Sequence, residues 1–144
     1  MSGERFFVDT AFLIALYSKT DESHETAVRW QPRYENARQI ISTEAVLIEL
    51  GNSFAKEYRL EATGIIEGFL KASATGDGRI KIIPVDTSLL RRGLEFYSSR
   101  KDKEWGLTDC ISFVVMKDEN LTDALTADRH FVQAGLRAML LEKG

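Results

Sequence analysis

The sequence predicts an α/β protein, a three-layer α/β/α sandwich around a central, mostly parallel sheet of five strands. Short apolar segments of strand length alternate along the whole chain with longer segments of helical periodicity. Parallel neighbours need crossover connections of helical length, so this alternation indicates a sheet covered by helices on both faces. With 144 residues, ten glycines and two prolines, the chain is expected to form one domain over residues 1–144.

Six elements are expected in the first half of the chain. Thr20 and Asp21 are expected to cap the second helix, and Pro32 is expected to end or kink it because proline lacks a backbone donor. The third helix has the most regular pattern, because apolar side chains from Leu47 to Tyr58 fall on one stripe. The predicted elements are a strand over residues 5–8, helices over 10–17 and 20–38, a strand over 39–42, and helices over 43–59 and 61–74.

The second half continues the alternation. A turn over residues 75–78 precedes a strand of alternating polarity, and Asp86 with Thr87 caps the helix that follows. Gly135 is expected to stop the last helix. The predicted elements are a strand over 79–83, helices over 87–99 and 108–117, a strand over 124–126, a helix over 129–134 and a strand over 138–141.

Composition excludes several classes of protein. The net charge of -3 gives no global positive field toward nucleic acid or anionic lipid. One cysteine and two distant histidines cannot form an internal disulfide or a cysteine-rich zinc site. The longest apolar stretches, 11–17 and 111–116, are far shorter than the roughly 20 residues that span a bilayer, and no signal peptide precedes Asp9. A reduced, cytoplasmic protein without a membrane partner is expected.

Two aspartates directly follow predicted strands. Asp9 comes after the strand over 5–8, and Asp128 comes after the strand over 124–126. In open parallel sheets, ligands bind beyond the carboxyl ends of the strands, so both are candidate functional residues. Each also precedes a predicted helix, so a role as helix N-cap explains either residue taken alone.

Two further acidic residues lie on predicted helices. Asp109 follows Thr108 in the first turn of its helix, where a carboxylate favours the helix dipole by about 0.3–1 kcal/mol. Glu49 lies in the middle of a helix, and its neighbours one turn away are small or polar, which leaves space around the carboxylate. A solvated helix face is the alternative explanation for Glu49.

Together, Asp9, Glu49, Asp109 and Asp128 could line one pocket at the same edge of the sheet. Carboxylates about 4 Å apart repel by several kcal/mol even at an effective dielectric constant of about 20, so such a cluster needs protons or cations. The donors are all hard oxygens, which suit Mg²⁺ or Mn²⁺ and argue against zinc. One or two such ions are the implied cofactor.

Four segments of the chain carry a family resemblance. They are Phe-Val-Asp-Thr-Ala at 7–11, the helix segment 44–52, Gly-Leu-Thr-Asp-Cys at 106–110 and Leu-Thr-Ala-Asp-Arg-His-Phe at 125–131. In this order, they resemble PIN-domain nucleases, a family that includes the VapC-like toxins of toxin–antitoxin pairs. The resemblance covers essentially the full length, and the last two segments are its most specific parts.

The resemblance implies a metal-dependent endoribonuclease. Asp9, Glu49, Asp109 and Asp128 match the acidic cluster that binds Mg²⁺ or Mn²⁺ in that family and hydrolyses RNA. Thr108 matches a hydroxyl residue beside the third acid, and Thr10 is expected to support the first. The resemblance further implies products with a 5′-phosphate and a 3′-hydroxyl, a homodimer, and a small antitoxin that places a basic side chain among the carboxylates.

The chain departs from the family pattern just after the fourth acid. Where relatives often carry another acidic or amide residue, this chain has Arg129 and His130, so occupancy of a second metal site is open. His130 is expected to be a structural cap, with contact to a phosphate or proton transfer as the alternatives. Cys110 lies in an apolar run without a nearby histidine, so it is expected to belong to the core rather than act as a nucleophile.

A polyanionic substrate needs a basic rim near an acidic pocket. The segment 79–103 has seven basic and three acidic residues, a local charge of +4 that leaves -7 for the remainder. A solvated face is the alternative explanation of such a run. Trp105 is expected to anchor its loop, and stacking on a base is the alternative. The candidate RNA contacts are Arg91, Arg92, Arg100, Lys101 and Lys103.

Three alternatives to nuclease activity are a phosphatase, a response-regulator receiver and a non-enzymatic scaffold. A Mg²⁺-dependent phosphatase of the haloacid-dehalogenase type needs an Asp-x-Asp pattern, but Asp9 is followed by Thr10 and Ala11. A response-regulator receiver needs an acidic pair near the first helix and a lysine after the last strand, and neither is evident. The non-enzymatic alternative is a PIN-like scaffold that binds RNA or protein without cutting, against which the presence of all four acids argues.

Overall fold

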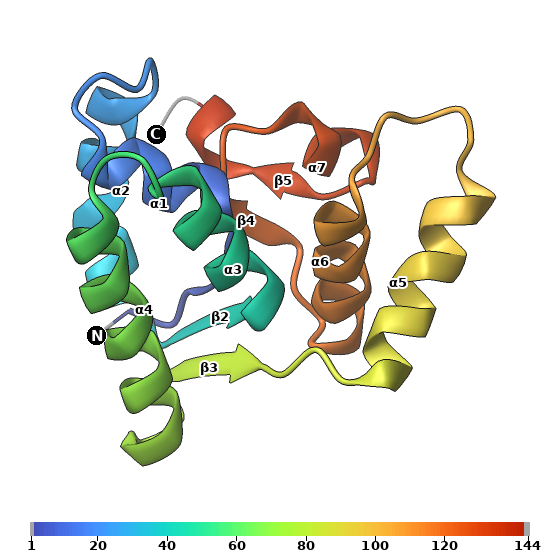
Figure 1. The fold of residues 1–144 in the computed structure, drawn as a ribbon, viewed down its shortest axis with the longest axis horizontal. Coiled ribbons are helices and arrows are strands. Elements are labelled where there is room, and N and C mark those ends of the chain that lie inside the picture. Colours follow the sequence, from blue (N-terminus) through green and yellow to red (C-terminus); the bar gives the residue numbers. More distant parts are fainter. Residues whose placement is uncertain (1, 143–144) are drawn as a thin grey trace.

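A single parallel sheet organises the computed structural model, which describes residues 2–142 (Figure 1). Every pair of neighbouring strands is parallel, in the order β3-β2-β1-β4-β5. The prediction of a mostly parallel, five-stranded sheet is therefore confirmed. The strands are β1 (Arg5–Val8), β2 (Gln39–Thr43), β3 (Ile80–Ile83), β4 (Asp123–Leu125) and β5 (Arg137–Ala138).

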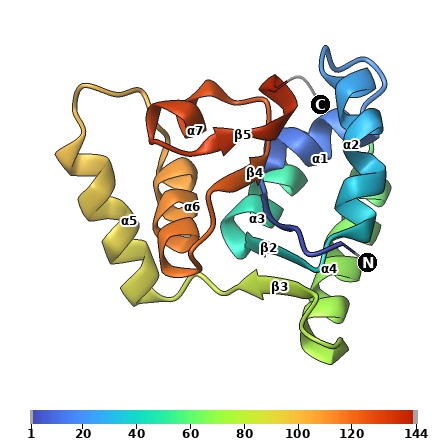
Figure 2. The ribbon, with the colours of Figure 1, turned by 180° about the vertical axis from the view of Figure 1, so that it is seen from behind.

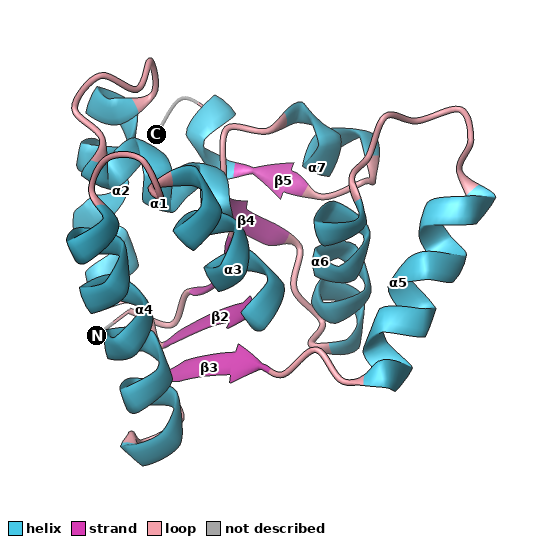
Figure 3. Ribbon diagram, in the orientation of Figure 1, coloured by secondary structure: helices cyan, strands magenta, loops and turns pink. Residues whose placement is uncertain are grey.

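Helices connect the strands in two groups. Figures 1 and 2 place α1 to α4 on one side of the molecule and α5 to α7 on the other, and Figure 3 shows the sheet between them. The chain moves outward from β1 to β3 and then returns to β4, and right-handed crossovers in opposite directions cover opposite faces of the sheet. The seven α-helices of the described residues are α1 (Thr10–Tyr17), α2 (His24–Asn36), α3 (Glu44–Ser53), α4 (Arg59–Thr75), α5 (Thr87–Ser99), α6 (Leu107–Asp118) and α7 (Arg129–Gln133).

The central strand β1 marks the point where the strand order reverses. It pairs with β2 on one side and with β4 on the other, and the Asp9 backbone N–H, just past its end, donates to the Leu125 carbonyl at 3.2 Å. At such a reversal the connecting helices diverge, which opens a crevice beyond the carboxyl ends of the two strands. Asp9 and the residues that follow β4 are therefore placed at the expected ligand-binding edge.

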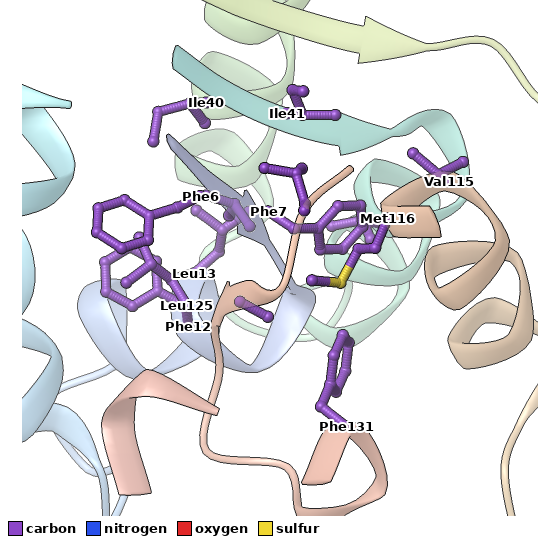
Figure 4. Packing of buried hydrophobic residues seen from close by; sticks show 14 of the residues in the cluster. Phe6, Phe7, Phe12, Leu13, Ile40, Ile41, Val115, Met116, Leu125 and Phe131 are labelled. Atoms are coloured by element: carbon purple, nitrogen blue, oxygen red, sulfur yellow. The ribbon is translucent and has the colours of Figure 1, made fainter. Parts of the chain in front are cut away.

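Aromatic packing fixes the elements that surround this edge. Phe131 of α7 is fully buried, as is Phe7 of β1 (Figure 4). The ring centroid of Phe131 lies 5.0 Å from that of Phe113 and 6.4 Å from that of Phe7. Trp105 packs on Phe113 at 5.1 Å, so the loop before α6 joins the same cluster. Burial of each such ring contributes about 1.5–3 kcal/mol. The core thus holds α6, α7 and β1 in a fixed relation.

The predicted helix over 43–59 ends early, at Ser53, and residues 54–58 form a turn, which corrects the most regular assignment from the sequence. Helix α3 ends at Ser53, and α4 begins at Arg59 after a turn in which Tyr58 adopts a left-handed φ of 65°. Gly51, Asn52 and Ser53 are poor helix formers, and the Ser53 hydroxyl donates to the Glu49 carbonyl, an interaction that bends helices. Local propensity therefore ends the helix although the apolar stripe continues.

Further boundaries differ from the prediction in α2 and in the last strand. Pro32 lies inside α2, which continues to Asn36, because the carbonyl it leaves unpaired belongs to the solvent-exposed Val28. The same helix begins at His24, since the Asp21 carboxylate accepts from the Ser23 N–H in a turn instead of capping a helix. The last predicted strand, 138–141, is the short strand β5 followed by a 3-10 turn over Met139–Leu141.

None of the helices in the described residues combines the length and the apolar character needed to cross a membrane.

Close packing of α5 on α6 gives a testable prediction about stability. A β-carbon at the buried Gly93 would lie 2.6 Å from Ile111 Cγ1 and 3.4 Å from its backbone. Gly93→Ala is therefore expected to lower the free energy of unfolding by about 1–3 kcal/mol, as overpacking does. Gly68→Ala, on an exposed part of α4 with open space around it, is the matched control and is expected to raise it by about 0.5–1 kcal/mol. Chemical denaturation measures both, and equal effects would contradict the packing argument.

Candidate active site

Three of the four predicted acids lie together at the carboxyl edge of the sheet. Asp9 follows β1, Asp109 lies in the first turn of α6, and Asp128 precedes α7 as its N-cap. Oxygens of Asp109 and Asp128 and a ring nitrogen of His130 lie within 4.8 Å of one another. Asp9 thus meets acids that lie 100 and 119 positions further along the chain.

Asp9 is the most deeply placed of these acids. Its side chain is buried, and its Oδ2 accepts a hydrogen bond of 2.8 Å from the Thr126 hydroxyl. Burial, together with the charges of Asp109, Asp128 and Glu49, raises the pKa of Asp9 to about 7, against the lowering effect of the Thr126 hydrogen bond. The ionised form of Asp9 is therefore unfavourable in this site. A cation that took the place of the proton would compensate the carboxylate charge.

Asp109 is held by two donors on one oxygen. The backbone N–H of Gly106 donates to Oδ2 at 3.2 Å, and the Nδ1 of His130 lies 3.0 Å from the same atom. Burial raises the pKa of Asp109, and the nearby negative charge of Asp128 adds to this, whereas the hydrogen bond with His130 opposes it. Asp109 therefore shares with Asp9 an environment that favours a bound proton or cation.

Asp128 fulfils the capping role that the sequence left open, and it does so with one oxygen. Its Oδ1 accepts from the backbone N–H of His130 at 2.8 Å, and its own N–H donates to the Thr126 hydroxyl oxygen at 3.0 Å. The His130 ring reaches the same Oδ1 at 3.5 Å. A cap and a metal ligand are compatible roles, because a carboxylate has two oxygens.

Each of the three carboxylates keeps one oxygen free of protein donors. Among the described residues, the side-chain hydrogen bonds of Asp9 and Asp109 end on Oδ2, and those of Asp128 end on Oδ1. No buried side-chain oxygen in residues 2–142 lacks a partner, so the free Asp9 oxygen is open to solvent. Three fixed side chains with three free, hard oxygens form a donor set that fits Mg²⁺ or Mn²⁺.

Glu49 lies beside this cluster rather than within it. Its side chain is exposed on α3, and it lines a pocket of about 280 Å³ together with Thr108 of α6. Its charge still contributes to the raised pKa of Asp9, so it is within electrostatic reach of the other acids. The structure therefore places Glu49 and Thr108 on one pocket, which Asp9, Asp109 and Asp128 do not line, with Glu49 within electrostatic reach of Asp9.

The hydroxyl that contacts the first acid is Thr126, which the sequence analysis did not single out. It was assigned to a strand, although its spacing of two residues from Asp128 fits a turn in which a hydroxyl accepts from a backbone N–H. Thr10, predicted to support Asp9, instead donates to the Val46 carbonyl at 3.5 Å and so links α1 to α3. The second residue that was missed as a contact of the acids is His130.

The basic segment has mixed surroundings. Arg92 forms two hydrogen bonds with Asp118 at the far end of α6, and Arg100 pairs with Asp102 and lies over the Trp105 ring at 4.9 Å. Lys103 also lies near Asp102, at 3.9 Å. The remaining candidate contacts, Arg91 and Lys101, are exposed and form no ion pair within residues 2–142.

Two sequence predictions about individual side chains are confirmed. Cys110 is fully buried and belongs to the core. Trp105 is buried as a loop anchor, and its indole N–H donates to the Gln133 side chain at 3.0 Å. Neither side chain is available at the surface, so neither is a nucleophile or a stacking platform in this conformation.

The family follows from the order of these elements and acids. The family model of the PIN domain matches residues 6–136, a range that contains all four acids. The chain belongs to the PIN domain family. A comparison with curated protein sequences returned no match.

Solved structures share this PIN fold at low sequence identity. The chain superposes on the Mycobacterium tuberculosis toxin VapC20, described as cleaving the sarcin–ricin loop, with a TM-score of 0.76 and 23% identity over 92% of this chain and 96% of that one. FitAcB from Neisseria gonorrhoeae gives a TM-score of 0.59 at 18% identity, covering 92% and 95%. VapBC2 from Rickettsia felis, bound to a DNA fragment from its promoter, gives 0.60 at 18%, covering 91% and 93%. At these identities, the likeness is one of fold.

Proposed function

We propose that this PIN domain is a Mg²⁺- or Mn²⁺-dependent endoribonuclease and the toxin of a toxin–antitoxin pair. The observation that supports it most is the arrangement of Asp9, Asp109 and Asp128, each held through one oxygen and free at the other. Membership of the PIN family supports a nuclease activity. Glu49 is proposed as the fourth acid, at the rim of the site.

The donor set decides which ion fits. Carboxylate oxygens dominate the free donors, and such donors suit Mg²⁺ and Mn²⁺ better than softer metals. When bound, the ion supplies positive charge that polarises the phosphodiester and activates water for attack. The pKa of Asp9 is raised first by burial and then by the neighbouring carboxylates, so the pocket does not stabilise the Asp9 charge unaided.

The protein's own residues position the reactants for hydrolysis. Thr126 fixes Asp9, and Gly106 fixes Asp109, so the acids need little reorganisation when the substrate arrives. Water attacks phosphorus, the bond from phosphorus to the 3′-oxygen breaks, and that oxygen takes up a proton, which leaves a 5′-phosphate and a 3′-hydroxyl. No covalent nucleophile is needed, and the buried Cys110 offers none.

A cleavage assay tests this proposal. Purified protein is incubated with total cellular RNA and, separately, with ribosomal RNA, in Mg²⁺, in Mn²⁺ and in chelator. Ribosomal RNA is included because the similar toxin VapC20 is described as cleaving the sarcin–ricin loop. We expect metal-dependent fragments with 5′-phosphate ends. Absence of cleavage together with absence of Mn²⁺ binding would overturn the proposal in favour of a non-catalytic scaffold.

The proposed partners include a small antitoxin and a second copy of the chain. The crowded carboxylates supply the negative charge that a basic antitoxin side chain would neutralise.

The homodimer is supported by an apolar groove of about 640 Å³ along α3 and α4. Ile48, which lines this groove, is 64% exposed. Helix α5 presents Leu90, Leu94 and Tyr97 as an exposed stripe. A two-fold dimer can pack such a ridge into such a groove twice.

Ile48→Glu tests the homodimer. A carboxylate in the apolar groove is expected to convert the dimer to monomer, because burial of an unpaired charge costs several kcal/mol. Leu60→Glu is the matched control: Leu60 is 82% exposed on α4 and does not line the groove, so the dimer should persist. Sedimentation equilibrium measures the mass of each variant. A monomeric wild type, or equal dissociation of both variants, would contradict the assignment.

A further inference from the structure

We propose that His130 is a positioning residue that holds Asp109 and Asp128 in place for metal binding without coordinating the ion. This inference rests on the proposed metal-dependent function. It differs from the capping role expected from the sequence, and from the alternative in which the ring of His130 is itself a ligand.

His130 bridges two carboxylates that come from different elements. Its backbone N–H donates to Asp128 Oδ1 at 2.8 Å, while its ring Nδ1 lies 3.0 Å from Asp109 Oδ2. Asp128 precedes α7 and Asp109 lies in α6, so one residue sets the relation between the two. The neighbouring Phe131 is fully buried against α6 and β1, which fixes the backbone from which the ring projects.

The chemistry of Nδ1 assigns its role. Both groups within its reach are carboxylate oxygens, which in their ionised, metal-binding form only accept hydrogen bonds. Nδ1 must therefore carry the hydrogen, and a ring nitrogen that carries hydrogen has no lone pair for a metal. The other ring nitrogen, Nε2, takes no part in the contacts with these oxygens.

The bridge leaves the outer oxygens for the ion. Asp109 Oδ2 accepts from both the Gly106 N–H and the His130 ring, so its acceptor capacity is used and Oδ1 is the atom available to a cation. Without the ring, Gly106 alone would hold the carboxylate, which could then rotate. Loss of such an orienting hydrogen bond to a metal ligand typically lowers metal affinity by about 10–100-fold.

Mn²⁺ titration by calorimetry tests the inference on the purified protein. His130→Ala is expected to weaken Mn²⁺ binding about 10–100-fold, whereas His130→Asn should recover most of the loss, because its amide N–H can take the place of Nδ1–H. The cap of Asp128 uses the backbone N–H, which both variants keep. His24→Ala is the matched control, since the ring of His24 contacts the Ala15 carbonyl, and its affinity should equal that of the wild type.

Electron spin echo spectroscopy of bound Mn²⁺ separates positioning from ligation. We expect no directly coordinated nitrogen in the wild type. A nitrogen coupling that disappears in His130→Ala would overturn the inference in favour of ligation, and unchanged affinity in His130→Ala would show that the bridge does not position the acids. A wild type that binds no Mn²⁺ would contradict the proposed function itself, so the two failures are distinguishable.

Discussion

Replacing Asp9 by asparagine is expected to lower RNA cleavage by at least about a thousand-fold while the fold is retained. Asp9 is buried, and the charges of Asp109, Asp128 and Glu49 all act on it, so the change removes a proposed metal ligand from a cluster that acts as a unit. Asparagine has the same shape and keeps an oxygen that can accept from the Thr126 hydroxyl. Metal-dependent cleavage of cellular RNA measures the effect, and cleavage at the wild-type rate would contradict the site.

Protein stability provides the control for Asp9→Asn. Because the folded pKa of Asp9 is about 7 and its ordinary value is 3.8, the folded protein holds a proton that the unfolded chain releases between pH 4 and 7. The wild type without metal therefore loses stability as pH rises through this range, and the loss is complete above pH 7. Asparagine does not ionise, so Asp9→Asn does not lose this stability. Its free energy of unfolding should exceed that of the wild type by roughly 2–4 kcal/mol at pH 8, with little difference at pH 4. Denaturation at both pH values measures it.

The fold was predictable where hydrophobic periodicity and strand spacing agree. The strand over 5–8 and the helices over 10–17 and 87–99 have the predicted bounds, because each is an uninterrupted pattern between clear boundary residues. The error over 43–59 has the opposite cause: Leu47 to Phe54 pack as one stripe, but local propensity ends the helix at Ser53. Periodicity reports which face is buried and does not report where backbone hydrogen bonds stop.

The candidate site was predictable as a set of acids but not as a network. Strand ends placed Asp9 and Asp128 at one edge, and the structure brings Asp109 beside them. The contacts of Thr126 and His130 with the acids were not predictable because they join residues 117 and 21 positions apart in the chain. A threonine at the end of a strand and a histidine at the start of a helix have ordinary local explanations, so only the tertiary structure reveals what they hold.

The affinity for Mn²⁺ is expected to depend on pH in a way set by Asp9. Below pH 7 the ion must displace a proton from Asp9, so the apparent affinity should fall about tenfold for each pH unit, and it should be nearly constant above pH 7. The raised pKa of Asp109 should steepen this fall at lower pH. Calorimetry in two buffers of different ionisation enthalpy would count about one released proton at pH 6. Affinity that does not change between pH 5 and 8 would contradict a bound ion at Asp9.

Thr126→Val shows whether this pH dependence belongs to Asp9. The Thr126 hydroxyl donates to Asp9 Oδ2 and lowers the pKa of that carboxyl against the effect of burial. Valine keeps the volume but removes the donor, so the pKa of Asp9 should rise and the pH at which Mn²⁺ affinity levels off should move upward. Ser112→Ala is the matched control, because that hydroxyl donates to the Thr108 carbonyl within α6 and not to an acid. If the pH at which Mn²⁺ affinity levels off moved equally in both variants, the pH dependence would belong to a group other than Asp9.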